Sequence, residues 1–224
     1  MKPSVVQYRN FRFSKLNTQE FSHLKLLIGW IGYFILYFLT EALIPAERCT
    51  PVRCFLDDWI PFCEWFVIPY VLWYGLVAGS VLYFALYNIT AFRKLSTYLI
   101  ITQIAAMAVY ILLPNRQDLR PAVFPRENFL TRIVSILYSI DTNTNVCPSL
   151  HCIGGFAILF AALDMPQFRK KAWPLFFTVF ALLICASTVF MKQHSIVDFF
   201  AAIPVIIIGW LCVYLPALMK RKQA

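Results

Sequence analysis

Two short segments of the chain carry residue types that can act together on a phosphate ester. The first, at residues 147–151, reads CPSLH, and the second, at residues 192–198, reads KQHSIVD. Residues four apart share a helix face, so Asp198 is expected to accept a hydrogen bond from one ring nitrogen of His194. The other nitrogen of His194 is then free as a nucleophile, and His151 can protonate the leaving group. We therefore predict His194, His151 and Asp198 as catalytic residues.

Cations and helix N–H groups near these histidines complete a candidate phosphate site. Arg116 and Arg120 follow the third apolar block of the chain, and Lys192 follows the fifth. Ser149 stands where a helix is expected to begin, with Pro148 in its first turn. The free N–H groups at a helix start bind anions, and guanidinium groups match phosphate oxygens. Arg120, Arg116, Ser149 and Lys192 are the predicted phosphate-binding residues.

The elements that must position these residues are apolar blocks of membrane-spanning length. The chain has 224 residues, of which 60% are hydrophobic and 14% charged, too few polar residues to cover a soluble protein of this size. A helix needs about 20 apolar residues to cross a bilayer. We predict an all-α polytopic membrane protein, a single domain over residues 1–224, with six spans near residues 25–44, 65–88, 95–114, 148–164, 172–191 and 197–218. The fourth block is the shortest.

The distribution of lysine and arginine predicts the orientation of the spans. With six spans, the side that holds both termini carries 13 of the 20 cations and 2 of the 11 acids. Cytoplasmic loops are enriched in such cations, so both termini are expected in the cytoplasm of a cell-membrane protein. The loops after spans one, three and five then lie outside, and so does the candidate site. Because orientation accounts for most of the net charge of +9, nucleic-acid binding is not expected.

The segments outside the spans carry further expectations. Residues 1–24 are polar and basic, which predicts no cleavable signal peptide and either an interfacial segment on the inner leaflet or a disordered tail. Residues 114–147 form a long outer loop, in which apolar residues at helical spacing predict a short amphipathic helix over Asn128 to Ile140. Asp57 and Asp58, in the first outer loop, are expected to be solvated.

The roles of several other polar residues and of the cysteines are left open by the sequence. Asp141 and Asn145 either support the first histidine segment or turn the loop before it. His23 is expected on the cytoplasmic side, away from the site. Seven cysteines include Cys49, Cys54 and Cys63 near the first outer loop, where an oxidising exterior permits a disulfide. Their pairing cannot be deduced from the sequence.

The order and spacing of these residues resemble the type 2 phosphatidic acid phosphatases, relatives of the vanadium haloperoxidases. Arg120-Pro121 resembles the end of the first motif of that family, and residues 148–151 resemble its Pro-Ser-Gly-His motif. Residues 187–198 resemble the third motif, with His194 and Asp198 at matching spacing. Three positions depart from the family pattern, because its motif lysine, glycine and arginine correspond to Leu113, Leu150 and Thr188. With these changes the sequence resembles a branch of the family that includes sphingolipid synthases.

This resemblance implies an enzyme that hydrolyses a lipid phosphomonoester or diphosphate through a phosphohistidine, without metal or cofactor. Whether Arg116 and Lys192 replace the two missing cations is left open. The alternative is a transferase of the sphingolipid-synthase type, which passes a phospho-headgroup to a lipid hydroxyl. The lipid substrate and the oligomeric state are left open.

Two other classes fit the composition less well. Two histidines and an aspartate can hold iron or zinc, but Arg116, Arg120 and Lys192 would repel a divalent cation. A membrane transporter would carry ionisable residues or matched helix breaks at the bilayer midplane. Pro69, Pro204 and Pro216 interrupt apolar blocks, but no matched ionisable pair lies in mid-span.

Overall fold

The computed structural model describes residues 8–170 and 172–223, and 74% of it is helical. Within these ranges five helices are long and apolar enough to cross a membrane: α1 (Leu26–Leu43), α3 (Val67–Tyr87), α4 (Ile89–Leu112), α7 (Trp173–Phe190) and α8 (Ile196–Gln223). The shorter elements are α2 (Leu56–Trp59), α5 (Phe129–Ile140), α6 (Leu150–Asp164), β1 (Thr50–Pro51) and β2 (Asn115–Arg116). Six 3-10 helices complete the described elements: η1 (Tyr8–Asn10), η2 (Phe13–Lys15), η3 (Ser22–Lys25), η4 (Ala46–Arg48), η5 (Glu64–Phe66) and η6 (Pro166–Arg169).

The long helices expose large apolar side chains on their outer faces, which identifies an integral membrane protein. Ile28 and Phe38 on α1 are 62% and 63% exposed, and Leu82 on α3 and Leu175 on α7 are exposed to a similar degree. In water this surface would carry a large hydrophobic penalty, whereas lipid tails cover it at no such cost. The predicted all-α membrane protein is therefore confirmed. The six-span arrangement stays a prediction, because α6 has 15 residues and rises about 22 Å against a hydrocarbon core of about 30 Å.

The start of α4 differs from the expected boundary near residue 95. Asn88 caps the helix by accepting a hydrogen bond from the backbone N–H of Ala91 (3.0 Å), so α4 begins at Ile89. Arg93 and Lys94, which fall between the predicted spans 65–88 and 95–114, therefore lie in the helix. Lys94 pairs with Asp164 at the end of α6 at 2.8 Å.

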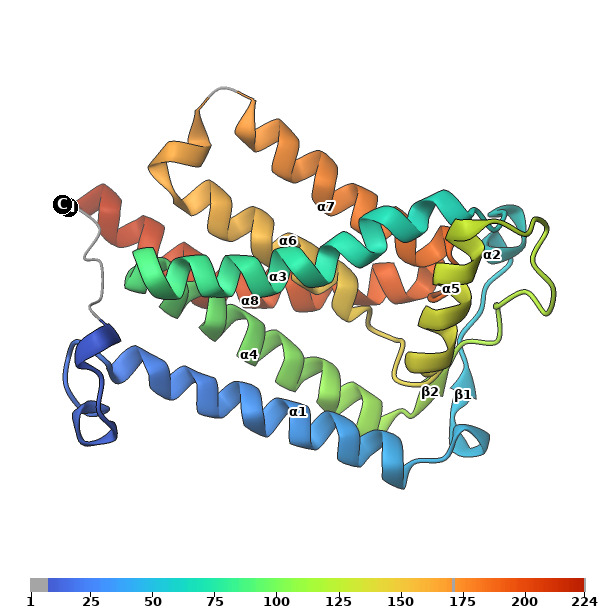
Figure 1. The fold of residues 1–224 in the computed structure, drawn as a ribbon, viewed down its shortest axis with the longest axis horizontal. Helices are drawn as coiled ribbons and strands as arrows, with labels where there is room; N and C mark the ends of the chain where they lie inside the picture. The colour runs from blue at the N-terminus through green and yellow to red at the C-terminus, as the bar shows by residue number, and fades with distance from the viewer. Residues whose placement is uncertain (1–7, 171, 224) are drawn as a thin grey trace.

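Helix α6 lies at the centre of the bundle and packs against α3, α4, α7 and α8 (Figure 1). Small residues allow this close approach. A Cβ at Gly154 would lie 2.7 Å from the indole of Trp73, and one at Gly155 would lie 3.6 Å from the carbonyl oxygen of Ala181. The buried face of α6 therefore fixes the depth at which its first turn, with His151, is held.

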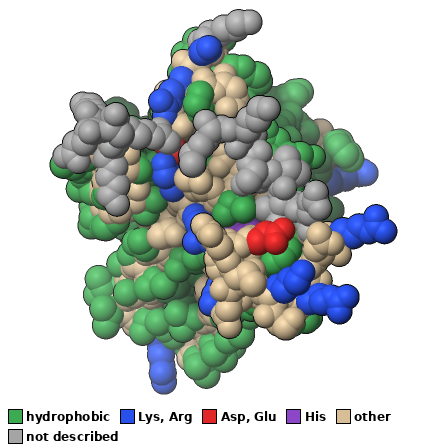
Figure 2. All heavy atoms as spheres, turned by 90° about the vertical axis from the view of Figure 1, so that its left-hand side faces the viewer, with side chains coloured by type: hydrophobic (Ala, Val, Ile, Leu, Met, Phe, Trp, Pro, Cys, Tyr) green, Lys and Arg blue, Asp and Glu red, His purple; other side chains and the backbone are tan. Residues whose placement is uncertain are grey.

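The segments that connect α1 to α3 and α4 to α6 lie at one end of the bundle (Figure 1). Strands β1 and β2 pair in parallel there, with Thr50 opposite Asn115, and α5 crosses the ends of the long helices. Asn128 and Thr131 form a capping box at the start of α5, which confirms the predicted amphipathic helix, with Asn128 as its cap. η1 and the last turns of α8 lie at the opposite end, where Figure 2 shows Lys and Arg side chains around the surface.

Candidate active site at the loop end of the bundle

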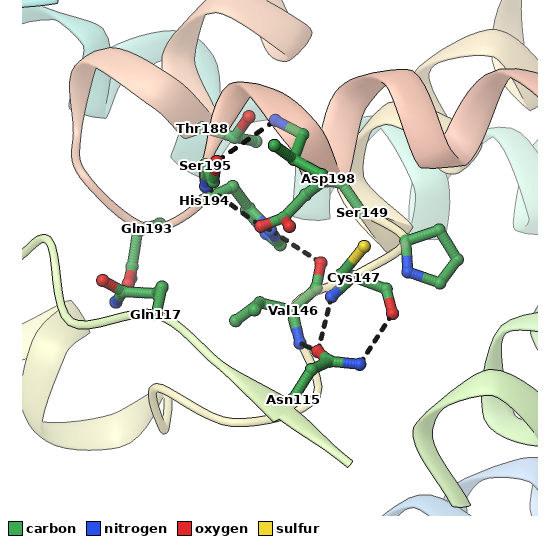
Figure 3. Close-up of polar contacts among 12 residues, drawn as sticks. Asn115, Gln117, Val146, Cys147, Ser149, Thr188, Gln193, His194, Ser195 and Asp198 are labelled. Atoms are coloured by element: carbon green, nitrogen blue, oxygen red, sulfur yellow. Dashed lines mark hydrogen bonds and ion pairs between the residues drawn. The ribbon is translucent and has the colours of Figure 1, made fainter. Parts of the chain in front are cut away.

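His194 and Asp198 meet at the start of α8, as the spacing predicted (Figure 3). Nδ1 of His194 lies 3.0 Å from Oδ2 of Asp198 and 2.9 Å from the carbonyl oxygen of Val146. A carboxylate and a carbonyl only accept hydrogen bonds, so Nδ1 carries the proton and donates it to both. The Nε2 lone pair of His194 is therefore free to attack an electrophile.

The charge on His194 is controlled by the same carboxylate. Burial lowers the pKa of His194, but the hydrogen bond and the negative charge of Asp198 outweigh burial and raise this pKa above its ordinary value. Asp198 is fully buried, and its Oδ2 also accepts from the backbone N–H of Ser195 at 3.0 Å. An imidazolium formed at His194 is thus stabilised by a carboxylate that is itself held in place.

His151 lies in the first turn of α6 and faces His194. The centroids of the two rings are 5.7 Å apart. Tyr70 and Trp73 of α3 flank the ring of His151, each with its centroid 4.3 Å away. His151 is 8% exposed, and its buried Nε2 finds no hydrogen-bond partner among the described residues. A buried polar atom without a partner is costly, which marks this nitrogen as a candidate for contact with a ligand.

Helix α6 begins at Leu150, two positions later than expected. Ser149 is the N-cap and accepts from the backbone N–H of Cys152 at 3.4 Å, so Pro148 precedes the helix instead of lying in its first turn. The backbone N–H of Ser149 donates to the carbonyl oxygen of Asp198 at 3.1 Å. That bond joins the two histidine segments directly. A phosphate contact by Ser149 stays a prediction.

Asn115 holds the loop that supports His194, a role the sequence did not reveal. Its Oδ1 accepts from the backbone N–H groups of Val146 and Cys147, at 2.9 and 2.8 Å (Figure 3). Its Nδ2 donates to the carbonyl oxygen of Cys147 at 2.9 Å. These bonds fix the carbonyl of Val146 against Nδ1 of His194. An asparagine just after a span gives no sequence signal for this contact.

Asp57 supports the other side of the site, and its expected solvation is wrong. The side chain is 2% exposed and accepts three hydrogen bonds: from Ser195 Oγ at 2.6 Å, from the N–H of Ile196 at 2.8 Å and from the N–H of Cys54 at 2.8 Å. A carboxylate at the first turn of a helix satisfies free N–H groups and complements the helix dipole. Asp58 is exposed and pairs with Arg53, as expected for a loop acid.

The three predicted cations lie around the site but donate to protein oxygens. Arg120 donates from all three of its nitrogens, to Gln193 and to the carbonyl oxygens of Tyr138, Asp141 and Thr142. Arg116 pairs with Asp118 and donates to the carbonyl oxygen of Ala46 at 2.6 Å. Nζ of Lys192 donates to the carbonyl oxygen of Asp57 at 2.7 Å, and burial lowers its pKa. Phosphate contact by these cations stays a prediction.

Two cavities meet at His151. The first is polar and small, about 40 Å³, and its described lining includes both histidines and Gln193 but neither Arg116 nor Lys192. The second is an apolar groove of about 890 Å³ between α1, α3, α4 and α6. It runs from His151 at one end to Tyr8 and Leu24 at the other. The residues lining both cavities are Tyr37, Asp141, Leu150 and His151.

The residues with open roles also have defined positions. Asp141 accepts a hydrogen bond from the hydroxyl of Tyr70 at 3.0 Å and lines both cavities. Asn145 turns the loop in the left-handed region (φ 56°), and it lines the polar cavity. His23 is buried at the opposite end and bonds to the hydroxyl of Tyr8 at 2.8 Å. All seven cysteines, each within the described ranges, are unpaired.

The chain matches no model of a known protein family, no curated protein and no solved structure.

Proposed function

We propose that the protein is a membrane lipid phosphatase that works through a phosphohistidine and needs no metal or cofactor. The observation that carries this proposal is the pair of acceptors on Nδ1 of His194, which directs the Nε2 lone pair to attack. A second imidazole, that of His151, lies 5.7 Å away between ring centroids, across a small polar cavity. Because both imidazoles line the same cavity, one can serve as nucleophile and the other as acid toward a single bound phosphoryl group.

The first half of the reaction forms the phosphohistidine. Nε2 of His194 attacks phosphorus while the bond from phosphorus to the lipid oxygen breaks. His151, as an imidazolium, gives its proton to that oxygen, and the lipid leaves as an alcohol or, from a diphosphate, as a monophosphate. The phosphorylated ring of His194 keeps its proton on Nδ1, and Asp198 neutralises its positive charge.

The second half returns the enzyme to its starting state. His151, now neutral, takes a proton from water as the water oxygen attacks phosphorus. The bond between phosphorus and Nε2 breaks, inorganic phosphate leaves, and both histidines recover their first protonation states. Phosphoryl transfer depends mainly on positioning and on charge stabilisation, which buried and held side chains supply.

The apolar groove supports a lipid as the substrate. It is large enough for hydrocarbon chains and ends at His151, so a lipid lying in the groove would place its phosphate in the polar cavity. With both termini in the cytoplasm and α6 as the fourth of six spans, the site faces outside the cell membrane. The cation-rich end of the bundle, opposite the site, supports this orientation (Figure 2).

The same groove favours a second candidate, transfer of a phospho-headgroup to a lipid hydroxyl. Because the groove opens directly on His151, an acceptor lipid can approach the phosphohistidine from the side where the first lipid left. Asp141 lies at this junction and can accept a hydrogen bond from the acceptor hydroxyl. Hydrolysis and transfer then differ only in which hydroxyl reaches phosphorus.

One experiment tests both candidates. Purified protein in detergent, with a chelator present, is given a panel of lipid phosphomonoesters and diphosphates, and inorganic phosphate is measured against His194→Ala as the blank. Hydrolysis predicts phosphate release that His194→Ala abolishes and an acid-labile phosphoprotein in the wild type. Transfer of a labelled headgroup to a lipid alcohol without phosphate release supports the second candidate. Wild-type activity that survives in His194→Ala contradicts both.

A further inference from the structure

The side-chain amide of Gln193, between Lys192 and His194, is buried, and the donors of a neighbouring arginine fix which way it is turned. Its side chain is 3% exposed and lines the polar cavity together with His151 and His194. Oε1 accepts from Nε of Arg120 at 3.0 Å and from Nη2 of Arg120 at 2.5 Å. Arginine has donors and no acceptors, so the amide oxygen must face Arg120 and the NH₂ group must point elsewhere.

The NH₂ group of Gln193 is buried without a hydrogen-bond partner in the described part of the chain. Native proteins pair nearly all buried donors, and an exception calls for an explanation. The unpaired Nε2 of His151 lines the same cavity. Two unpaired polar groups on one small cavity are suited to bind a polar ligand.

The backbone around Gln193 is held firmly enough to position a donor. The N–H groups of Gln193 and His194 both donate to the carbonyl oxygen of Thr188, at 3.0 and 3.1 Å. Lys192 adopts a left-handed conformation (φ 54°), which turns the chain at the end of α7. The amide of Gln193 and the ring of His194 are therefore carried by two consecutive residues anchored to one acceptor.

Arg120 is built as a support for this amide. Besides Gln193, it donates to the carbonyl oxygens of Tyr138, Asp141 and Thr142, at 2.9 to 3.0 Å. Its guanidinium also lies over the ring of Tyr138, 4.6 Å from the centroid. Because each guanidinium nitrogen donates a hydrogen bond to a protein oxygen, Arg120 influences the cavity through the side chain of Gln193.

We propose that the side-chain NH₂ of Gln193 donates a hydrogen bond to an oxygen of the transferring phosphoryl group, and that Arg120 is the positioning residue that orients this amide. The inference rests on the proposed phosphoryl-transfer function and adds a ligand contact to it. The charge of Arg120 polarises the amide, so the NH₂ becomes a stronger donor to a developing negative charge. A fixed donor of this kind acts most strongly in the transition state.

Gln193→Glu separates this role from a structural one. Glutamate keeps an oxygen facing Arg120, where its charge strengthens that contact, but replaces the NH₂ donor with an acceptor. We expect the variant to unfold at the wild-type temperature or above, while phosphate release falls by about 10²-fold or more. Orthovanadate, a probe with the shape of a transferring phosphoryl group, should stabilise the wild type against heat and fail to stabilise Gln193→Glu.

Asn143→Asp is the matched control for added charge, because it makes the same amide-to-carboxylate exchange outside the lining of the cavity. It should keep wild-type activity and vanadate binding. If Gln193→Glu releases phosphate within about threefold of the wild type, the donor role is overturned while the proposed function stands. A wild type with neither phosphate release nor vanadate binding overturns the proposed function, and this inference with it.

A double-mutant cycle tests the role given to Arg120. If Arg120 acts through Gln193, the losses of kcat in Arg120→Ala and Gln193→Ala should not multiply in the double variant. Losses that multiply would show that Arg120 contacts the phosphoryl group independently. That result would overturn the positioning role.

Discussion

Ser195 Oγ donates a 2.6 Å hydrogen bond to the buried carboxylate of Asp57, a residue 138 positions earlier in the chain. The same carboxylate accepts from the N–H of Ile196, so the segment between α1 and α3 caps the helix that carries Asp198. The segment that presents His194 is thus held from two sides, by Asp57 on one and by the loop around Val146 on the other. The position of His194 therefore depends on contacts between segments that are distant in sequence.

Removal of the Asp57 side chain should destabilise the protein and impair catalysis. Asp57→Ala leaves the buried hydroxyl of Ser195 and two N–H groups without their acceptor. We expect the free energy of unfolding to fall by about 2–4 kcal/mol, measured by thermal unfolding in detergent. Asp58→Ala, at the exposed neighbouring acid, should change it by less than about 0.5 kcal/mol. Equal effects of the two substitutions would contradict the anchoring role of Asp57.

The pH dependence of activity should report the Asp198 carboxylate. His194 must be neutral to attack, so activity falls as the pH drops through its pKa, which Asp198 raises. Asp198→Asn removes the negative charge and lowers that pKa. The acidic limb of the kcat/KM profile should therefore move to lower pH, while the maximal rate falls by about 10²- to 10⁴-fold. If the acidic limb of the Asp198→Asn profile lies at the same pH as that of the reference variant Asp58→Asn, the charge of Asp198 does not control the pKa of His194.

A substitution that disturbs the tight contact between α6 and α3 should lower both stability and activity. A Cβ at Gly154 would lie 2.7 Å from the indole of Trp73, which flanks His151. Gly154→Ala must displace that indole, at a cost of about 1–3 kcal/mol in stability, and we expect activity to fall about tenfold. Gly155→Ala meets its nearest neighbour at an ordinary 3.5 Å and should behave as the wild type. Steady-state kinetics and thermal unfolding of both variants test this difference.

Narrowing the apolar groove should affect lipid substrates selectively. Ala78 lines the groove, whereas a Cβ at Gly79, the next residue of α3, would meet no atom within 4 Å. Ala78→Phe should raise KM for a long-chain lipid phosphate several-fold and leave a short, soluble phosphate ester unaffected. Gly79→Phe should change neither. A uniform loss on both substrates would show that the groove does not hold the lipid chain.

The sequence predicts contacts within the two histidine segments better than contacts between these segments and the residues around them. The four-residue spacing of His194 and Asp198 predicts their contact, although His194 precedes α8 and only Asp198 lies in its first turn. Apolar block length determines the long helices, since the bilayer sets that length. The helix over residues 129–140 also follows from local periodicity and its Asn128 cap.

Contacts across long separations could not be inferred in this way. Asp57 and Asn115 look like ordinary loop residues, and only the fold places them under Ser195 and Val146. The predicted cations show the same limit, because their type and order in the chain do not say which oxygens they contact. Arg120 donates to Gln193 and to loop carbonyls instead of standing open to solvent.

The sequence by itself determined the membrane class of the protein, the helical periodicities and the residue types available for phosphoryl transfer. These properties depend on hydrophobicity and on the geometry of a single helix, which act over a few residues at a time. The tertiary structure decided which side chains meet: the approach of His151 to His194, the anchoring by Asp57 and the pairing of Arg120 with Gln193. Such contacts depend on how helices pack and loops close, which short-range sequence patterns do not encode.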